Sequence, residues 1–308
     1  MAASLPSLVI TGASGFIGRR LLHALAERGA TRVTALARDP LRLTGLSDWR
    51  PEWRALPCDL ASADVPSGAI PPDAVVLHLA ASTGKMSPAA MSSVNVRGTG
   101  RVIDAARASD ARHFIFVSSI AAGFADQRWY HYARAKRVAE HLVSSSRVPH
   151  SIVRPTMVFG PGSPIEAALT GLATGGAPIV LGTGTVRVQP VHVDDVVELL
   201  LALAATAPTG PAPLEVGGGD RLTLRELLAR IRAARALAPR TPLSIPLGAV
   251  RLALGAVEPV LLPLLPVTAG QLAAFVNHSD AAPSDIVVRL LPAPRGIEAM
   301  LTAVSSHG

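Results

Sequence analysis

Short apolar runs alternate with amphipathic helical stretches along the first half of this chain, and this alternation narrows the choice of fold more than any other feature. The expected strands lie at residues 8–11, 32–37, 53–58, 74–79, 114–117 and 151–153. Helical patterns fall between several of them, at residues 16–28, about 87–108 and 130–145. Continuous apolar strands separated by helices are typical of a parallel sheet covered on both faces. The sequence therefore predicts an α/β fold built on a doubly wound parallel sheet.

The second half of the chain has a less regular pattern, in which Pro and Gly are frequent. Residues 196–205 and 222–236 have helical patterns, whereas residues 238–266 are rich in Pro and Leu and have no readable role. We expect residues 1–158 to form the core and residues 159–308 to form a smaller mixed region over the mouth of the sheet. Residues of about 186–236 are expected to pack back on the core.

The composition excludes several classes of protein. Of the 308 residues, 49% are apolar and 17% are charged, a balance that favours a buried core and argues against disorder. The formal net charge of +7 is scattered along the chain without a block of five like charges, so no nucleic-acid partner is expected. Cys58 is the single cysteine, which rules out an intrachain disulfide and a zinc cluster of cysteines.

The sequence contains no pattern of a membrane anchor. Its first residues lack a basic stretch followed by a long apolar core, so we expect no secretory signal. The longest apolar stretch, residues 245–267, is interrupted by Pro, Arg and Glu, whereas a spanning helix needs ~20 apolar residues. We therefore expect a cytoplasmic protein with a small-molecule substrate and no transmembrane segment. Contact with a membrane surface and the choice between a monomer and a homodimer stay open.

A glycine-rich loop lies between the first expected strand and the first expected helix. Residues 11–18 read TGASGFIG, which places Gly12, Gly15 and Gly18 at intervals of three. Such a turn lets backbone N–H groups approach a pyrophosphate, and the N-terminus of the following helix favours negative charge. The loop therefore predicts dinucleotide binding, with a plain tight turn as the alternative.

The end of the second expected strand bears on the choice of cofactor. Proteins that prefer NAD usually place Asp or Glu there, where the carboxylate accepts from the ribose 2′-OH. In this chain Arg38 follows the strand, and a guanidinium can bind a phosphate with two hydrogen bonds. Arg19 or Arg20 could add positive charge. The pattern favours NADP(H) over NAD(H), with Asp39 at the ribose as the alternative.

Tyr132 and Lys136 stand four residues apart on an expected helix and so share one face. An ammonium beside a phenol favours the phenolate and lowers the pKa of the phenol, which makes it a usable acid or base near neutral pH. Tyr130 and Arg134 have the same spacing, but an arginine keeps its proton in a protein. Tyr132 is therefore the better candidate, with an ordinary amphipathic helix as the alternative.

Two further pairs of polar residues could take part in the chemistry. Ser118 and Ser119 follow the fifth expected strand, at the end where open parallel sheets bind ligands. Asp194 and Asp195, close after His192, have residue types that suit a metal. We expect no metal there, because either carboxylate would instead cap the following helix and favour its dipole.

Taken together, these pieces resemble the extended short-chain dehydrogenase/reductase family, also called the NAD-dependent epimerase/dehydratase family. The matching segments occur in the family's order over about the first 230 residues: residues 11–18, 58–60, 78–81, 95–99, 116–119, 132–136, 154–162, 189–197 and 214–228. The C-terminal residues 247–279 resemble the tail of the subfamily related to an accessory subunit of respiratory complex I. They also resemble NADP-linked reductases of bulky hydrophobic carbonyls. The resemblance implies a Rossmann core with a substrate-covering region.

The resemblance also implies roles for individual residues. Tyr132 would be the general acid/base, and Lys136 would lower its pKa and hold the nicotinamide ribose. Ser119 would position the reacting oxygen, with Ser118 as the alternative, and Asn95 would be structural. The implied cofactor contacts are Gly12, Ser14, Gly15, Phe16, Ile17, Gly18, Arg38, Asp59, Leu60, Ala80, Ala81, Lys136 and Pro155.

We therefore expect an NADP(H)-dependent oxidoreductase that interconverts a hydroxyl and a carbonyl on an apolar small molecule. The 12 residues between Ser119 and Tyr132 form a shorter segment than sugar-nucleotide epimerases usually have, which argues against such a substrate. Two alternatives stay open: an NAD(P)-dependent epimerase or dehydratase that retains its cofactor, and a non-catalytic NADP(H)-binding subunit or sensor.

Overall fold

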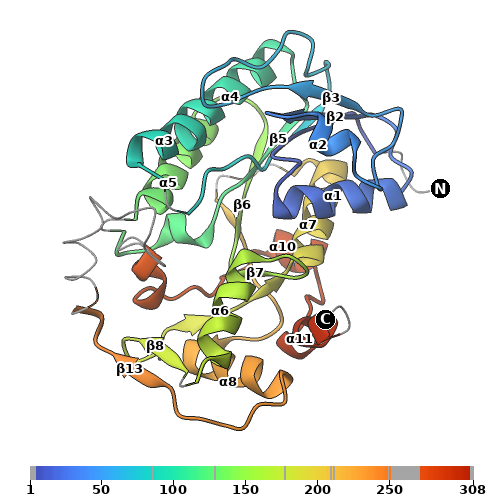
Figure 1. The fold of residues 1–308 in the computed structure, drawn as a ribbon. Helices are drawn as coiled ribbons and strands as arrows, with labels where there is room; N and C mark the ends of the chain where they lie inside the picture. The colour runs from blue at the N-terminus through green and yellow to red at the C-terminus, as the bar shows by residue number, and fades with distance from the viewer. Residues whose placement is uncertain are drawn as a thin grey trace.

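A computed structural model describes residues 5–84, 86–127, 130–176, 178–208, 210, 212–248, 250 and 271–305 (Figure 1). A seven-stranded sheet has the order β11-β6-β5-β4-β1-β2-β3, and every neighbouring pair is parallel. Its strands are β1 (Leu8–Thr11), β2 (Val33–Ala37), β3 (Arg54–Pro57), β4 (Val75–His78), β5 (His113–Val117), β6 (His150–Pro155) and β11 (Leu214–Val216). The order reverses beside β1, so the crevice for ligands is expected at the carboxyl ends of β1 and β4.

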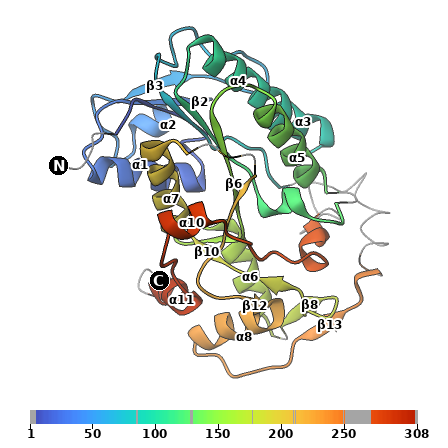
Figure 2. The same ribbon diagram turned by 180° about the vertical axis from the view of Figure 1, so that it is seen from behind.

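The central strands are buried along their whole length because helices cover both faces of this sheet. One face packs against α1 (Phe16–Glu27), α7 (Val193–Thr206) and α10 (Asp285–Leu290). The other face packs against α4 (Thr99–Ala108) and α5 (His131–Ser144), and α3 (Pro88–Ser92) and the π-helical turn η1 (Ser93–Gly98) pack beside α5. Figures 1 and 2 show the two groups on opposite sides of the sheet, with the short helix α2 (Leu41–Thr44) near β2 and β3. The predicted doubly wound α/β fold is confirmed.

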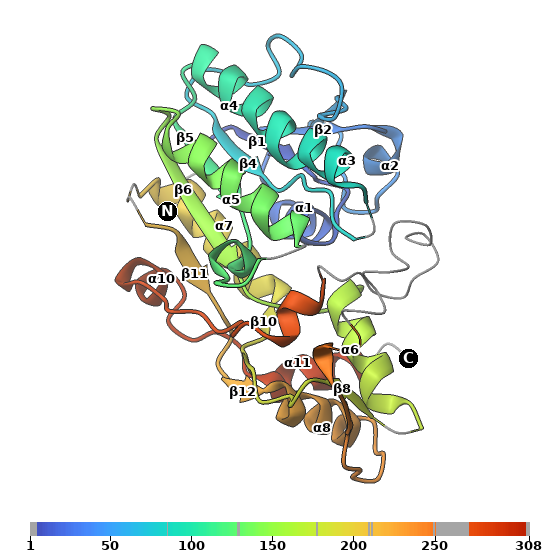
Figure 3. The same cartoon turned by 90° about the vertical axis from the view of Figure 1, so that its left-hand side faces the viewer.

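A third apolar core lies beyond the sheet, in the lower part of Figure 3. It is built mainly from α6 (Pro164–Thr174), α8 (Leu224–Ala234) and α11 (Ile297–Ser305). Short strand pairs accompany it: β7 (Val158–Phe159) with β10 (Val191–His192), β9 (Arg187–Val188) with β12 (Leu222–Thr223), and β8 (Ile179–Leu181) with β13 (Leu243–Ile245). The 3-10 turns η2 (Ile120–Gly123) and η3 (Gln271–Phe275) complete the described elements.

Two expectations for the second half need correction. Sequence reasoning missed β11, a three-residue strand that pairs Leu214 with Val153 of β6 and closes one edge of the sheet. A run this short carries no readable alternation of its own. The helix expected at residues 222–236 begins at Leu224, because Leu222 and Thr223 pair with β9 before the helix starts. Most of the segment 247–267 lies outside the described residues, and the division at residue 158 stays a prediction.

The start of α7 also differs from the expectation. His192, rather than Asp194 or Asp195, is the cap: its Nδ1 accepts from the Asp194 backbone N–H at 3.2 Å. Both carboxylates lie in the first turn, where they still favour the helix dipole. Asp194 pairs with Arg20 of α1, and Asp195 pairs with Arg295. These distant guanidiniums, which no local pattern reveals, explain why the carboxylates turn away from the cap.

Two features are absent from the described residues. Among them, no group of His, Cys, Asp and Glu is arranged to hold a metal ion. No helix in this described part is long and apolar enough to cross a membrane.

Candidate active site

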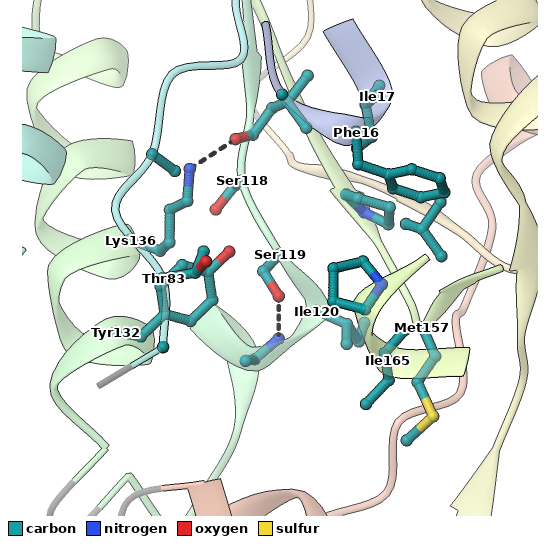
Figure 4. Close-up of a pocket in the computed structure, with 18 of the residues that line it drawn as sticks. Phe16, Ile17, Thr83, Ser118, Ser119, Ile120, Tyr132, Lys136, Met157 and Ile165 are labelled. Carbon is teal, nitrogen blue, oxygen red and sulfur yellow. Dashed lines mark hydrogen bonds between the residues drawn. The ribbon is translucent and has the colours of Figure 1, made fainter. Parts of the chain in front are cut away.

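A cavity of about 650 Å³ lies at the carboxyl ends of the central strands. Its walls include residues that directly follow or end β1, β4, β5 and β6: Gly12, Leu79, Ser118 and Pro155. Figure 4 shows Phe16 and Ile17 on one side of the cavity and the side chains of α5 on the other. The sheet therefore brings the glycine loop and the expected catalytic helix to one space.

The glycine loop has the close packing that a bound pyrophosphate needs. Gly12 has a φ of +75°, and a Cβ there would lie 2.5 Å from the backbone N of Ala80. A Cβ on Gly18 would collide with the carbonyl oxygen of Gly12. The N-cap of α1 is Gly15, which has no side chain to cover the first turn, and Phe16, Ile17 and Gly18 of that turn line the cavity. These residues fit a dinucleotide phosphate on the positive end of α1.

Lys136 and Tyr132 both line the cavity from α5. Lys136 is 2% exposed, and its Nζ donates to the carbonyl oxygen of Val117 at 2.8 Å. The same Nζ lies 4.7 Å from the centroid of the Phe116 ring and 6.0 Å from that of Tyr132. The expected pairing of a phenol and an ammonium on one helix face is present.

The electrostatics of this pair differ from the expectation. Burial lowers the pKa of Lys136 to about 7, and the Glu140 carboxylate opposes that shift. Burial raises the pKa of Tyr132 above its ordinary value; neighbouring Tyr130 adds to the rise, and a hydrogen bond with Ser119 opposes it. The sequence predicted that Lys136 lowers this pKa, but burial is the largest cause of the shift and Lys136 is not among its causes.

The two serines after β5 have different partners. Ser118 is 3% exposed, and its Oγ donates to Oε1 of Glu140 at 2.5 Å. The Ser119 hydroxyl accepts from the backbone N–H of Ala121 at 3.2 Å and shares a hydrogen bond with the Tyr132 phenol. Both serines line the cavity, but Ser119 is the one whose hydroxyl meets Tyr132. The hydroxyl of Ser118, the alternative candidate, is instead hydrogen-bonded to the buried carboxylate of Glu140.

The remaining predicted cofactor contacts divide into two groups. The cavity is lined by Gly12, Gly15, Phe16, Ile17, Gly18, Ala81, Lys136 and Pro155. Outside its lining lie Ser14, Arg38, Asp59, Leu60 and Ala80. Ala80 touches the glycine loop through its backbone N–H, which donates to Thr11 Oγ1 at 3.3 Å. Leu60 is buried in the core, and Asp59 accepts from the Ala61 backbone N–H at 3.1 Å.

The charged residues near the end of β2 differ in whether they already have partners, and this affects which of them could contact the ribose or phosphate of the cofactor. Arg38 is exposed. Asp39 accepts from the Leu41 backbone N–H at 3.2 Å and pairs with Arg42 at the same distance. Arg20, one of the two further cations considered, is held by Asp194. The side chain of Asn95, expected to be structural, bonds to both backbone groups of Ser82.

Sequence reasoning missed the apolar wall of the cavity. This wall comprises Met91, Phe124, Tyr130, Met157, Val158, Pro164, Ile165 and Ala168, and Ser279 also lines the cavity. The rings of Phe124 and Tyr130 stack with centroids 6.5 Å apart. Among the described residues that line the cavity there is no Arg, Asp or Glu. No spacing signal could have identified these residues, because they come from loops and helices far apart in the chain.

Comparison with known proteins agrees with this geometry. Residues 8–217 match the model of the NAD dependent epimerase/dehydratase family. The ceramide reductase of Caulobacter vibrioides is 31% identical over 230 residues, which cover 72% of this chain and 68% of that protein. The 3 beta-hydroxysteroid dehydrogenase/Delta 5→4-isomerase of Mycobacterium tuberculosis is 25% identical over 242 residues, covering 69% and 64%. The chain thus spans about two thirds of the length of these relatives.

Solved structures agree on the fold. The crystal structure of gox2253 superimposes with a TM-score of 0.76 at 23% identity, covering 98% of this chain and 99% of the other. At that identity the likeness concerns the fold alone. The family match extends from β1 to the segment after β11, and it includes the glycine loop and the Tyr132–Lys136 pair. The chain therefore belongs to the NAD-dependent epimerase/dehydratase family, as an NAD(P)-dependent enzyme of the short-chain dehydrogenase/reductase type.

Proposed function

We propose that this protein is an NADP(H)-dependent oxidoreductase that interconverts a hydroxyl and a carbonyl group on an apolar small molecule. One observation carries the proposal: Tyr132, Lys136 and Ser119 line the same cavity as the glycine loop, and the rest of that cavity is largely apolar. In this reading, residues 1–158 hold the dinucleotide and residues 159–308 cover the substrate. Ile165 and Ser279 of the second part line the cavity together with Gly12 and Tyr132 of the first.

The residues have distinct tasks in this reaction. The nicotinamide cofactor, when bound, supplies or accepts the hydride. Tyr132 exchanges the proton with the substrate oxygen, and Ser119, already bonded to that phenol, holds the oxygen in place. Lys136 holds the nicotinamide ribose and places positive charge near the phenol. Because burial raises the pKa of Tyr132, its phenol is protonated at neutral pH, and a positive charge on nearby Lys136 would ease the transfer of that proton to a carbonyl substrate.

The cavity wall supports an apolar substrate. A sugar nucleotide carries a diphosphate, which proteins usually bind with arginine, lysine or helix N-termini. Lys136 is the one lysine, and no arginine occurs, among the described residues that line the cavity. Phe124, Tyr130 and Met157 instead offer flat and flexible apolar surface. The names of the relatives, a ceramide reductase and a hydroxysteroid dehydrogenase, also favour a large apolar substrate.

A panel of carbonyl compounds with NADPH tests the proposed reaction. We expect one molecule of NADPH to be consumed for each carbonyl reduced, with long-chain or fused-ring ketones reacting best. NADPH disappearance at 340 nm and product analysis by mass spectrometry measure the two sides. An epimerase or dehydratase would convert its substrate with tightly retained cofactor and no net consumption. Binding of NADPH without turnover of any compound would instead identify a non-catalytic subunit or sensor.

Arg38 is the basis for proposing NADP(H) over NAD(H). The carboxylate of Asp39 is occupied by the Leu41 N–H and by Arg42, whereas Arg38 is exposed after β2. A charge-assisted bond to a phosphate contributes about 1.5–3 kcal/mol. We therefore expect Arg38→Gln to raise the Kd for NADPH about tenfold or more and to leave the Kd for NADH nearly unchanged.

Fluorescence titration with both cofactors checks this expectation. Arg42→Gln is the matched control, because Arg42 is an exposed cation in the same loop that already pairs with Asp39. It should leave the preference for NADPH in place. If the wild-type protein binds NADH as tightly as NADPH, the assignment of Arg38 fails.

A further inference from the structure

Behind the cavity, a buried carboxylate lies one helical turn after Lys136. Glu140 is 7% exposed. Arg154 of β6 clamps it with two hydrogen bonds, from Nε to Oε1 at 2.9 Å and from Nη2 to Oε2 at 2.7 Å. Ser118 donates to the same Oε1 at 2.5 Å. Glu140 does not line the cavity, so its place in this arrangement is behind the groups that do.

The charges of this cluster do not balance by themselves. Arg154 also reaches Glu215 of β11 with a distance of 3.4 Å, and Glu215 accepts from the backbone N–H of Ala282 at 3.0 Å. Two carboxylates therefore share one guanidinium, which leaves one negative charge in excess. A buried net charge is costly unless an opposite charge compensates it. The Lys136 ammonium, at i−4 from Glu140 on the same helix, is the cation on which Glu140 acts electrostatically, and it is placed to offset that charge.

The other groups around Lys136 do not provide a counter-charge. From β5, it meets the carbonyl oxygen of Val117 and the ring of Phe116. From its own helix it meets the neutral phenol of Tyr132. From β4 it faces His78, whose burial lowers its pKa to about 3 and so keeps the imidazole neutral at pH 7. Glu140 is the carboxylate that acts on Lys136 among the described residues.

We propose that Glu140, held by Arg154, is a positioning residue that keeps Lys136 in its ammonium form beside Tyr132. The inference deepens the proposed function and rests on it for its catalytic meaning. Burial lowers the pKa of Lys136 and Glu140 raises it, and the balance lies at about 7. The ammonium is present below that pH and is lost above it. Without Glu140 the loss moves to lower pH, so Lys136 is neutral at pH 7 and Tyr132 has no cation beside it.

The lysine content of the chain makes a direct test feasible. Lys85 and Lys136 are its two lysines, so protein labelled with ¹³C-lysine gives two Cε signals, and Lys85→Arg assigns them. In the wild-type protein we expect the Lys136 signal to titrate near pH 7. Glu140→Gln should move this midpoint down by about one pH unit or more, because an opposite charge is lost. Arg154→Gln should move it up, because Glu140 is then no longer neutralised.

Glu215→Gln is the matched control. It removes the carboxylate that shares Arg154 with Glu140 but is not among the groups acting directly on Lys136, so it should lower the midpoint by less than Glu140→Gln does. An unchanged midpoint in folded Glu140→Gln overturns the proposal, as do shifts of the same sign in the Glu140 and Arg154 variants. If Glu140→Gln does not fold, the direction of the Arg154→Gln shift decides. A wild-type midpoint below about 5 would also overturn it, because the ammonium would then lack compensation.

These titrations need neither cofactor nor substrate, so their outcome is independent of the proposed reaction. Once a substrate is known, the pH profile of kcat/KM supplies the catalytic readout. In this profile, kcat/KM should fall as Lys136 loses its proton, and the midpoint of that fall should shift in each variant as the NMR midpoint does. Glu140→Asp, which keeps the carboxylate, should restore the wild-type profile. A merely structural role would lower activity at all pH values and would leave the midpoint of the fall in place.

Discussion

Tyr132→Phe is expected to lower kcat for the reactive carbonyl compound by about 10²–10⁴-fold and to leave the Kd for NADPH almost unchanged. The phenol supplies the proton to the substrate oxygen, whereas the glycine loop and α1 bind the cofactor phosphates. Phe keeps the ring that lies 6.0 Å from the Lys136 ammonium, so packing is conserved and the hydroxyl alone is lost. Steady-state kinetics and fluorescence titration separate the two effects.

Tyr130→Phe is the matched control for this prediction. Tyr130 lines the same cavity, and its ring lies 5.9 Å from that of Tyr132. Its own partner at i+4 is Arg134, which is exposed and cannot move a proton at neutral pH. Tyr130→Phe should therefore keep most of the activity. Equal losses in the two variants, or an active Tyr132→Phe, would remove Tyr132 from the mechanism.

Gly12→Ala is expected to raise the Kd for NADPH by at least about 100-fold, or about 3 kcal/mol. The residue has a φ of +75°, which costs a residue with a Cβ about 1–2 kcal/mol. The added Cβ would lie 2.5 Å from the backbone N of Ala80 and 2.7 Å from the backbone carbon of Leu79. Neither is the end of a flexible side chain, so the loop must move away from β4. The N–H groups that face the cofactor phosphate then move with it.

Gly29→Ala separates the steric cause from the conformational one. Gly29 also has a positive φ, +64°, but a Cβ there would meet nothing within 4 Å. It should lower the free energy of unfolding by about 1 kcal/mol and leave cofactor binding unchanged. Calorimetry of the cofactor titration and thermal unfolding of both variants measure the difference. If Gly12→Ala binds NADPH like the wild type, the loop does not hold the phosphates.

The sequence predicted the features whose cause is local. The strands of the sheet carry continuous apolar runs, the glycines of residues 11–18 mark a turn, and Tyr132 and Lys136 share a helix face by their spacing alone. It could not predict the pairing of polar groups across the fold. Ser118 and Ser119 are neighbours of the same type, yet one bonds to Glu140 and the other to Tyr132.

Other distant contacts gave no signal for the same reason. The sequence suggested Arg20 as a cation for a cofactor phosphate, but in the folded protein Arg20 forms an ion pair with Asp194. The strand β11 is too short to be recognised by pattern and exists because β6 offers it an edge. The shift of the Tyr132 pKa depends on how much protein surrounds the phenol, which spacing does not encode.

Periodicity and turn-forming glycines were thus enough for the sequence to predict the doubly wound sheet and a loop suited to a dinucleotide, and the family resemblance added Tyr132 as the candidate acid/base. These properties arise from residues that interact within a few positions of each other. The tertiary structure alone decided the apolar wall of the cavity, the partner of each serine and the charge balance around Lys136. Those properties arise from residues brought together by chain folding, where desolvation and pairing depend on neighbours that are remote in sequence.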